Sequence, residues 1–383
     1  MTDVAAAVVG VAESDLGVTG KTALELLTQA SLGALQDAGL SLQDVDGLAT
    51  AGVSRMPTTQ VAEYLGISPR WTDGTMVGGS SFEVFLGHAA EAIRTGLAET
   101  VLICYGSNQR SARSRRFGHT LDPALPSSQF EAPYGPLNPI SMYAIAGQRH
   151  MHEFGTTPEQ LAEVAVAARE WALLNPKAYR HQAGSITVEE VLSSPMVSSP
   201  LHVLDCCLIT DGGAAAVVTS VERARDLAKR PVRVLGHGEA TTHFGLSQMT
   251  DLTATGAYDS ARRAYEMAGL TPDEVDVAEL YDSFTITTLL TLEALGFCGR
   301  GESGSFVEKG RIAPGGDFPL NTSGGGLSYC HPGMYGLLLV VEAVRQLRGE
   351  AGPRQVEGCK TAVCHGTGGI LSSHSTVLLG ADR

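Results

Sequence analysis

Two stretches of this chain repeat each other in a constant register. Residues 34–46 (ALQDAGLSLQDVD) match residues 264–276 (AYEMAGLTPDEVD), 230 positions further on. Both are amphipathic helices that end in Ala-Gly-Leu, with Gly39 and Gly269 expected as C-terminal caps. A β-like run precedes each helix and a strand is expected to follow it. A repeat of this length predicts two similar α/β halves, each a sheet covered by helices.

Two further matches favour duplication over chance similarity of amphipathic helices. Residues 90–94 (AEAIR) resemble residues 341–345 (VEAVR), 251 positions apart, and both halves carry a Gly-Gly-rich strand, at 211–218 and 366–369. The second register places Gly79 and Ser80, at the start of a helix, opposite Cys330 and His331. With halves related by a pseudo-twofold axis, both helix starts face one pocket. We therefore expect two five-stranded sheets, equivalent helices at 22–38 and 253–268, and a site between the halves.

Composition excludes several classes of partner. The net charge of −14, from 27 basic and 41 acidic residues, disfavours nucleic acid and anionic membranes. The longest apolar stretches, such as 336–344, are too short to span a bilayer, and the first residues do not resemble a signal peptide. The seven cysteines lack zinc-type spacing, so we expect reduced thiols, no metal site and a cytoplasmic location.

Four stretches concentrate reactive side chains beside glycine: 78–81 (GGSS), 280–284 (LYDSF), 329–332 (YCHP) and 364–369 (CHGTGG). His331, fixed next to a proline, is placed to act as a proton donor or base, unless it is simply a turn histidine with satisfied bonds. Cys364 and His365 have the residue types of a nucleophile and its base. Adjacent residues of a strand point to opposite faces, however, so a structural cysteine is an equally good interpretation.

The same stretches resemble the thiolase superfamily over nearly the whole chain. Residues 281–284 (YDSF) are similar to the HDxF or NEAF loop of that family, residues 321–333 to its NxxGGxxxxGHPxG loop, and residues 364–368 to its CxGxG loop. The sterol-carrier-type lipid-transfer branch is closer still, because residues 149–155 (RHMHEFG) and 204–214 (LDCCLITDGGA) resemble its hallmarks. The resemblance implies a thiolase-like α/β fold whose duplicated halves form helix–sheet–helix–sheet–helix layers.

The sequence departs from the thiolase pattern at two important positions. Gly79 stands where a thiolase has its acylated cysteine, and Tyr281 stands where the family has an oxyanion-hole histidine. Ser80 has no evident base to activate it. His331 is kept, between Tyr329 and Tyr335. A covalent acyl-enzyme at the first helix start is therefore not expected.

What remains resembles the thiolase-like aldolases of bacterial steroid side-chain degradation. The resemblance implies retro-aldol cleavage of a β-hydroxyacyl-CoA to a ketone and a short acyl-CoA such as propionyl-CoA, with no cofactor besides the coenzyme A of the substrate. Tyr281 and His331 are the first candidates for the chemistry, followed by Tyr329 and Tyr335, of which either one is a candidate to face the pocket. The expected substrate-binding residues are Gly79, Ser80, Asp282, Cys364, His365 and Gly366, and Gly79 and Ser80 are expected to make room for a bulky substrate.

The resemblance also implies how the chain is divided and what it binds. Residues 1–230 would form the first half, with an inserted loop region at about 106–200, and residues 231–383 the second half. We expect a homodimer formed through the strand from Glu99 to Tyr105, with Cys104 buried, and a small partner with an OB-fold and a zinc ribbon, giving a heterotetramer. Two alternatives stay open: a true thiolase or acyltransferase that uses Cys330 or Cys364, and a degenerate protein that only binds acyl-CoA or lipid.

Overall fold

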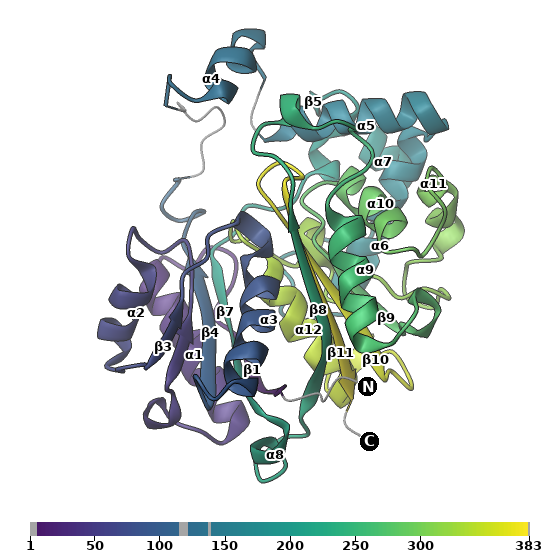
Figure 1. Cartoon of the computed structure of the whole chain (residues 1–383). Helices are drawn as coiled ribbons and strands as arrows, with labels where there is room; N and C mark the ends of the chain where they lie inside the picture. The colour runs from purple at the N-terminus through teal and green to yellow at the C-terminus, as the bar shows by residue number, and fades with distance from the viewer. Residues whose placement is uncertain (1–5, 115–121, 137–138, 382–383) are drawn as a thin grey trace.

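The computed structural model describes residues 6–114, 122–136 and 139–381 (Figure 1). Its core is one mixed sheet with the strand order β3-β2-β4-β7-β1-β8-β11-β10-β9. The strands of the first half are β1 (Ala6–Glu13), β2 (Gly47–Ala49), β3 (Trp71–Asp73), β4 (Thr100–Ser107) and β7 (Gly212–Ser220). Those of the second half are β8 (Val232–Thr241), β9 (Val277–Leu280), β10 (Thr361–Gly368) and β11 (Ser373–Ala381).

The prediction of two separate five-stranded sheets is wrong in two respects. Strands β1 and β8 pair through Ala7 with Arg233 and Val8 with Val232, so the two half-sheets are continuous. The first half has the five expected strands, whereas the described part of the second half has four. Leu320 contributes only a single parallel bridge, to Ala278, where a fifth strand would lie.

The predicted layers are present. Helices α3 (Ser81–Arg94) and α12 (Gly336–Arg348) lie between the half-sheets and contact strands of both, while α1 (Ala23–Ala38) covers the outer face of the first and α9 (Ala257–Ala268) that of the second (Figure 1). Strand periodicity explains this arrangement. Val8 of β1 packs into the core around α3 and α12, whereas its neighbours Ala7 and Val9 pack under α1.

The repeated segments occupy equivalent places. Gly39 and Gly269 end α1 and α9 in the left-handed conformation, at φ 73° and 66°. Each helix is followed by a short 3₁₀ turn with a capping box, η1 (Leu42–Asp44) and η6 (Pro272–Glu274), and then by a strand. The start expected for the second helix is too early, since α9 begins at Ala257. Thr253 lies in the preceding loop, where its backbone N–H donates to the Asp251 side chain.

The strand proposed for dimerisation does not lie at an edge. Strand β4 pairs with β2 on one side and with β7 on the other, so its backbone is already satisfied within the chain. The expected burial of Cys104 is confirmed, since its side chain is fully buried. In the described sheet the edge of the first half is β3.

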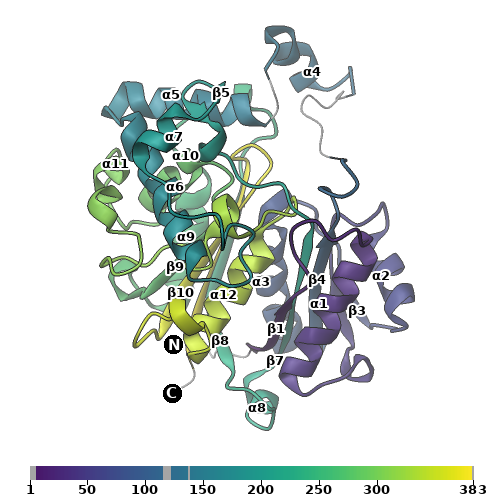
Figure 2. The same ribbon diagram turned by 180° about the vertical axis from the view of Figure 1, so that it is seen from behind.

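The remaining elements surround this core. They are the helices α2 (Pro57–Leu65), α4 (Pro126–Phe130), α5 (Ile140–Phe154), α6 (Pro158–Leu173), α7 (Val188–Ser193), α8 (Val221–Ala224), α10 (Thr285–Ala294) and α11 (Ser303–Phe306), and a small hairpin of β5 (Met196–Ser198) and β6 (Leu201–His202). Figure 2 shows α5, α6 and α7 beside α10, over the second half, while α4 projects away from the body. Within the described ranges no helix has the length and apolar character needed to cross a membrane.

Candidate active site

Tyr281 follows directly after β9 and lies against the start of α3. Its backbone N–H donates to the carbonyl of His365 in β10 (2.9 Å), which fixes the loop to the sheet. A methyl group placed on Gly79 would lie 2.7 Å from Cζ of Tyr281 and 2.5 Å from the carbonyl oxygen of Thr367, closer than side chains pack. The space that Gly79 leaves is therefore filled by the Tyr281 ring. This corrects the expectation that Gly79 makes room for a bulky substrate.

Tyr281 and His331 form a hydrogen-bonded pair. The phenol oxygen lies 2.9 Å from His331 Nε2, and the phenol also lies within hydrogen-bond distance of the Gly333 carbonyl (3.2 Å) and the Tyr335 N–H (3.3 Å). The His331 backbone is held on both sides: its N–H donates to Thr210 Oγ1 (3.0 Å) and its carbonyl accepts from Gln109 Nε2 (2.8 Å). A phenol bonded to an imidazole can accept and return a proton, which is what general acid–base catalysis requires.

Tyr335 belongs to the same group of rings. Tyr335 stands edge-on to Tyr281, with ring centres 5.8 Å apart, and stacks on His331 at 6.1 Å. Its hydroxyl bonds to Ser323 Oγ (3.1 Å). The Tyr329 phenol is influenced by Glu13 and Arg345 instead. Burial raises the pKa of both phenols well above the ordinary value, so both remain protonated at neutral pH.

Asp282 faces backbone amides. Its carboxylate accepts from the N–H groups of Gly326 (2.6 Å) and Leu327 (3.3 Å) in the π-helical turn η8 (Gly325–Tyr329), which leads to His331. Burial raises the pKa of Asp282 to about 7, although these bonds favour the charged form. Asp282 therefore connects the Tyr281 loop to the His331 loop, a different placement from the substrate contact expected from the sequence.

The other residues expected to bind substrate are buried among protein groups. The hydroxyl of Ser80 lies within hydrogen-bond distance of Ser373 Oγ (3.0 Å) and of the Val77 carbonyl (3.2 Å). His365 is bonded to Thr376 Oγ1 (2.8 Å) and to His374 Nδ1 (3.2 Å), and burial lowers its pKa well below the ordinary value.

Cys364 faces the opposite side of β10, toward the core around α12, as the alternation of strand residues predicts. Burial raises the pKa of the Cys364 and Cys330 thiols well above the ordinary value. Neither sulfur is therefore a thiolate at neutral pH.

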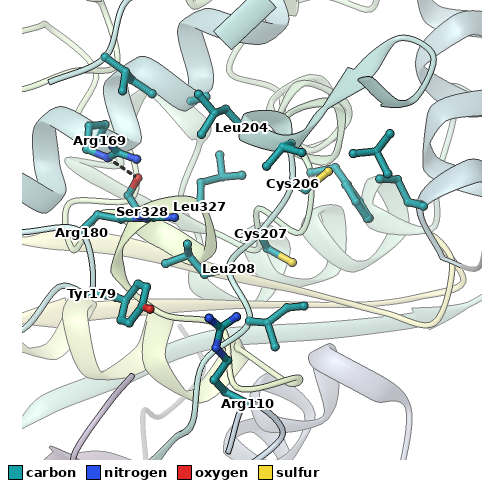
Figure 3. A pocket seen from close by; sticks show the side chains of 17 residues that line it. Arg110, Arg169, Tyr179, Arg180, Leu204, Cys206, Cys207, Leu208, Leu327 and Ser328 are labelled. Carbon is teal, nitrogen blue, oxygen red and sulfur yellow. Dashed lines mark hydrogen bonds between the residues drawn. The ribbon is translucent and has the colours of Figure 1, made fainter. Parts of the chain in front are cut away.

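A cavity of about 350 Å³ borders the loops of the Tyr281–His331 pair (Figure 3). Phe284, Leu327 and Ser328 line it, and each belongs to one of those loops. The segment 207–210 links its wall to both loops, because Cys207 N–H donates to the Ser283 carbonyl (3.0 Å) and Leu208 N–H to the Gly326 carbonyl (2.8 Å). Tyr281 and His331 are not among the lining residues, although the sequence predicted that they would line the pocket.

Three arginines that the sequence analysis missed reach this cavity. Arg169 and Arg180 lie on one side of it and Cys206 and Cys207 across from them, with Arg110 at a further wall (Figure 3). Arg169 donates to Ser328 Oγ (3.2 Å), and burial and the neighbouring charge of Arg180 lower its pKa. None of the three forms an ion pair with a carboxylate of the described residues. Arginines that gather at a cavity without an ion pair favour an anionic ligand, and this arrangement is visible only in the structure.

Among the described residues, no group of three or more histidine, cysteine or acidic side chains is arranged to hold a metal ion.

The family model for a thiolase C-terminal domain-like region matches residues 238–381. The chain is 36% identical to a "Steroid side-chain-cleaving aldolase" of Thermomonospora curvata, over 99% of this chain and 98% of that protein. A "17-hydroxy-3-oxo-4-pregnene-20-carboxyl-CoA lyase" of Mycobacterium tuberculosis is 38% identical over 90% of this chain and 92% of its own.

An "Acetyl-CoA acetyltransferase" of Methanothermobacter thermautotrophicus is 36% identical over 96% of this chain and 98% of its own. Among solved structures, one titled "Ltp2-ChsH2(DUF35) aldolase" superposes with a TM-score of 0.90 at 34% identity, covering 99% of this chain and 98% of that chain.

Proposed function

Because the chain belongs to the thiolase superfamily, in its sterol-carrier-type lipid-transfer branch, we propose that it is a carbon–carbon lyase acting on a β-hydroxyacyl-CoA. The substrate class is a steroid side-chain CoA thioester with a tertiary β-hydroxyl group. The products are a ketone and a short acyl-CoA such as propionyl-CoA. The names of the two lyase relatives support both the reaction type and the substrate class.

One observation carries this proposal: the Tyr281 ring occupies the space in which a thiolase needs its cysteine side chain. Acyl transfer to a thiolate is thereby replaced by proton transfer through a phenol bonded to His331. Tyr281 accepts the β-hydroxyl proton while its own phenol proton passes to His331 Nε2, the Cα–Cβ bond breaks, and its electron pair passes into the thioester enolate. The phenol then gives a proton to Cα and recovers one from His331, so that the reaction balances without a co-reactant.

The runner-up, a true thiolase, is supported by the relative named as an acetyltransferase. It requires a thiolate, which the raised pKa of Cys330 and Cys364 opposes. We expect Cys330→Ala and Cys364→Ala to keep most of the wild-type activity. The assay measures release of the ketone and the short acyl-CoA from a tertiary β-hydroxyacyl-CoA without added free CoA. An absolute need for free CoA, or an inactive Cys364→Ala variant, would support thiolysis instead.

The arginine-lined cavity is the proposed binding place for the phosphates of coenzyme A. Each charge-assisted hydrogen bond contributes about 1.5–3 kcal/mol, so losing one weakens binding by roughly ten- to a hundredfold. We expect Arg180→Ala and Arg110→Ala to raise KM for the acyl-CoA by such a factor and to leave kcat nearly unchanged.

The control variant is Arg55→Ala, because Arg55 is exposed like Arg110 but does not line this cavity. The second control is an acyl-pantetheine substrate, which lacks the nucleotide phosphates. With this substrate the Arg180 and Arg110 variants should match the wild type. An equal loss on both substrates would place the arginines in a structural role.

We also propose a homodimer bound to a small OB-fold and zinc-ribbon subunit. The structure titled "Ltp2-ChsH2(DUF35) aldolase" supports a partner of the DUF35 type. Exposed aromatic side chains offer apolar surface for it: Phe130, at the end of α4, is 65% exposed, and Tyr134, in the 3₁₀ turn that follows, is 88% exposed. A fully active monomer in sedimentation experiments would contradict this assembly.

A further inference from the structure

The segment 207–211 leads from the arginine-lined cavity to the start of β7. Residues 207–209 line the cavity, as Figure 3 shows for Cys207 and Leu208, whereas Thr210 and Asp211 do not line it and are fully buried. Successive residues of an extended segment point to opposite sides. Thr210 and Asp211 therefore contact different parts of the protein, and the proposed cleavage step uses neither of them directly.

Thr210 holds the backbone of His331. Its side-chain Oγ1 accepts from the His331 N–H (3.0 Å), and its own backbone N–H donates to the His331 carbonyl (3.2 Å). The same carbonyl also accepts from Gln109 Nε2 (2.8 Å). Both backbone polar groups of His331 are thus fixed, while its Nε2 lies 2.9 Å from the Tyr281 hydroxyl.

Asp211 holds the backbone of Arg110 on the opposite side. One carboxylate oxygen accepts from the N–H groups of Arg110 (3.0 Å) and Ser111 (2.9 Å). The other accepts from the Ser111 hydroxyl and from the N–H (2.9 Å) and the hydroxyl (3.0 Å) of Thr19. Burial acts to raise the pKa of Asp211, but the bonds from Ser111 and Thr19 lower it below the ordinary value, so the group is ionised at neutral pH.

The charged group of Arg110 takes no part in these bonds to Asp211. The carboxylate accepts from the backbone N–H of Arg110, and so it fixes the turn from which the side chain extends to the cavity. Asp211 thus orders Arg110 without pairing with its guanidinium. An arginine that is to bind a phosphate needs this arrangement, because its guanidinium N–H groups must remain available to the ligand.

We propose that Thr210 and Asp211 are positioning residues of the lyase with separate tasks. Thr210 holds His331 in place for proton transfer, and Asp211 holds Arg110 in place for the phosphates of the acyl-CoA. The inference rests on the proposed function. It predicts that two neighbouring residues affect different kinetic constants, kcat for Thr210 and KM for Asp211.

The first test replaces Thr210 by valine, which has a similar shape but no acceptor for the His331 N–H. We expect kcat for ketone release to fall by about ten- to a hundredfold and KM to change little, because a small displacement of a catalytic group slows the chemical step by up to this factor. Thr210→Ser keeps the hydroxyl and should recover most of the loss. Thr219→Val is the matched control and should keep the wild-type kcat, since Thr219 is also fully buried and its hydroxyl donates to the Glu99 carbonyl (2.7 Å).

Two results would overturn the role of Thr210: a Thr210→Val enzyme with the kcat of wild type, or a Thr210→Ser enzyme as slow as Thr210→Val. If Thr210→Val does not fold, Gln109→Ala takes its place, because it removes the second side-chain bond to the His331 backbone. It should lower kcat in the same direction. An unchanged kcat would show that anchoring this backbone does not control the chemical step.

The second test is Asp211→Asn, in which one carboxylate oxygen becomes an NH₂ group that cannot accept a hydrogen bond. We expect KM for the acyl-CoA to rise by about tenfold, no more than for Arg110→Ala, and kcat to stay close to wild type. The double variant with Arg110→Ala should have the KM of Arg110→Ala alone, because Asp211 acts through Arg110. With an acyl-pantetheine substrate, which lacks the nucleotide phosphates, Asp211→Asn should match the wild type.

Asp46→Asn is the matched control for this test. The Asp46 carboxylate also accepts from two backbone N–H groups, those of Glu99 (2.9 Å) and Thr100 (2.8 Å), but it does not line the cavity, so KM and kcat should stay as in wild type. If a thermal melt shows that Asp211→Asn does not fold, Ser111→Ala replaces it with the same expected direction, because it removes one donor to the Asp211 carboxylate.

The role of Asp211 would be overturned by an unchanged KM, by a KM increase that persists with acyl-pantetheine, or by one that adds in full to that of Arg110→Ala. These results are separable from failure of the proposed function. A wild-type enzyme that releases no ketone from a β-hydroxyacyl-CoA would refute the lyase itself, whereas an active wild type with unaffected Thr210 and Asp211 variants would refute only the two positioning roles.

Discussion

Replacing Tyr281 by phenylalanine is expected to lower kcat for cleavage by about 10²–10⁴, the usual contribution of a general acid–base group. The change keeps the ring that packs against Gly79 and removes only the hydroxyl bonded to His331 (2.9 Å). The hydroxyl also contacts the Gly333 carbonyl and the Tyr335 N–H, so its loss leaves buried groups unpaired and stability should fall by about 1–3 kcal/mol. Stopped assays of ketone release, together with thermal melts of both proteins, measure the two effects separately.

Tyr105→Phe is the matched control for this experiment. The Tyr105 hydroxyl is also buried and bonds to the same loop: it donates to the Pro332 carbonyl (2.8 Å) and accepts from the Met334 N–H (3.3 Å). Its loss should cost similar stability and leave most of the activity. If Tyr281→Phe stays within tenfold of wild type, or Tyr105→Phe is equally inactive, the phenol of Tyr281 is not the proton-transfer group.

Gly79→Ala is expected to abolish most activity through a single added methyl group. The new carbon would lie 2.7 Å from Tyr281 Cζ and 2.5 Å from the Thr367 carbonyl oxygen, so the ring must move away from His331. We expect a loss in kcat of at least about 10², as for removal of the acid–base group, and a loss in stability of about 1–3 kcal/mol from overpacking. Gly79→Cys should behave in the same way and should not create a thiolase.

The control for this prediction lies five residues earlier. A methyl group on Gly74 would meet its neighbours at 3.6 Å or more, an ordinary contact, so Gly74→Ala should be nearly neutral. Combining Gly79→Ala with Tyr281→Ala should cost less stability than the two changes added together, because the smaller residue frees the space for the methyl group. Additive losses, or an active Gly79→Ala enzyme, would show that the two positions do not compete for the same space.

The parts of the fold that local patterns encode were predictable. The repeat identified α1 and α9, and their capping glycines adopt the left-handed conformation that the sequence suggested. Sheet pairing depends on residues far apart in the chain. The sequence therefore did not show that β4 is enclosed by β2 and β7, or that β1 joins β8.

The sequence predicted which residues belong to the candidate site but not which of them contact each other. The motifs brought Tyr281 and His331 forward, and the structure brings their side chains together. The Tyr281 ring packs against Gly79, which is distant from it in sequence, so no local sequence pattern predicts this contact. The burial of Glu83, near the start of α3, was not predictable either. A glutamate near a helix start ordinarily lies on its solvated side, and only the packing of α12 and β10 shows that this one is enclosed.

The central position of α3 and α12 has an evolutionary consequence. Each helix packs on strands of both halves, so either half alone would expose a wide apolar face to water. A second copy of the same half offers the matching surface, which makes a symmetric dimer of single halves the natural ancestor of such a chain. In such an ancestor the loops that lead into both helices would be identical. Fusion of two such genes would remove this constraint, so that the turn before α3 can have glycine at position 79 while the loop before α12 carries His331.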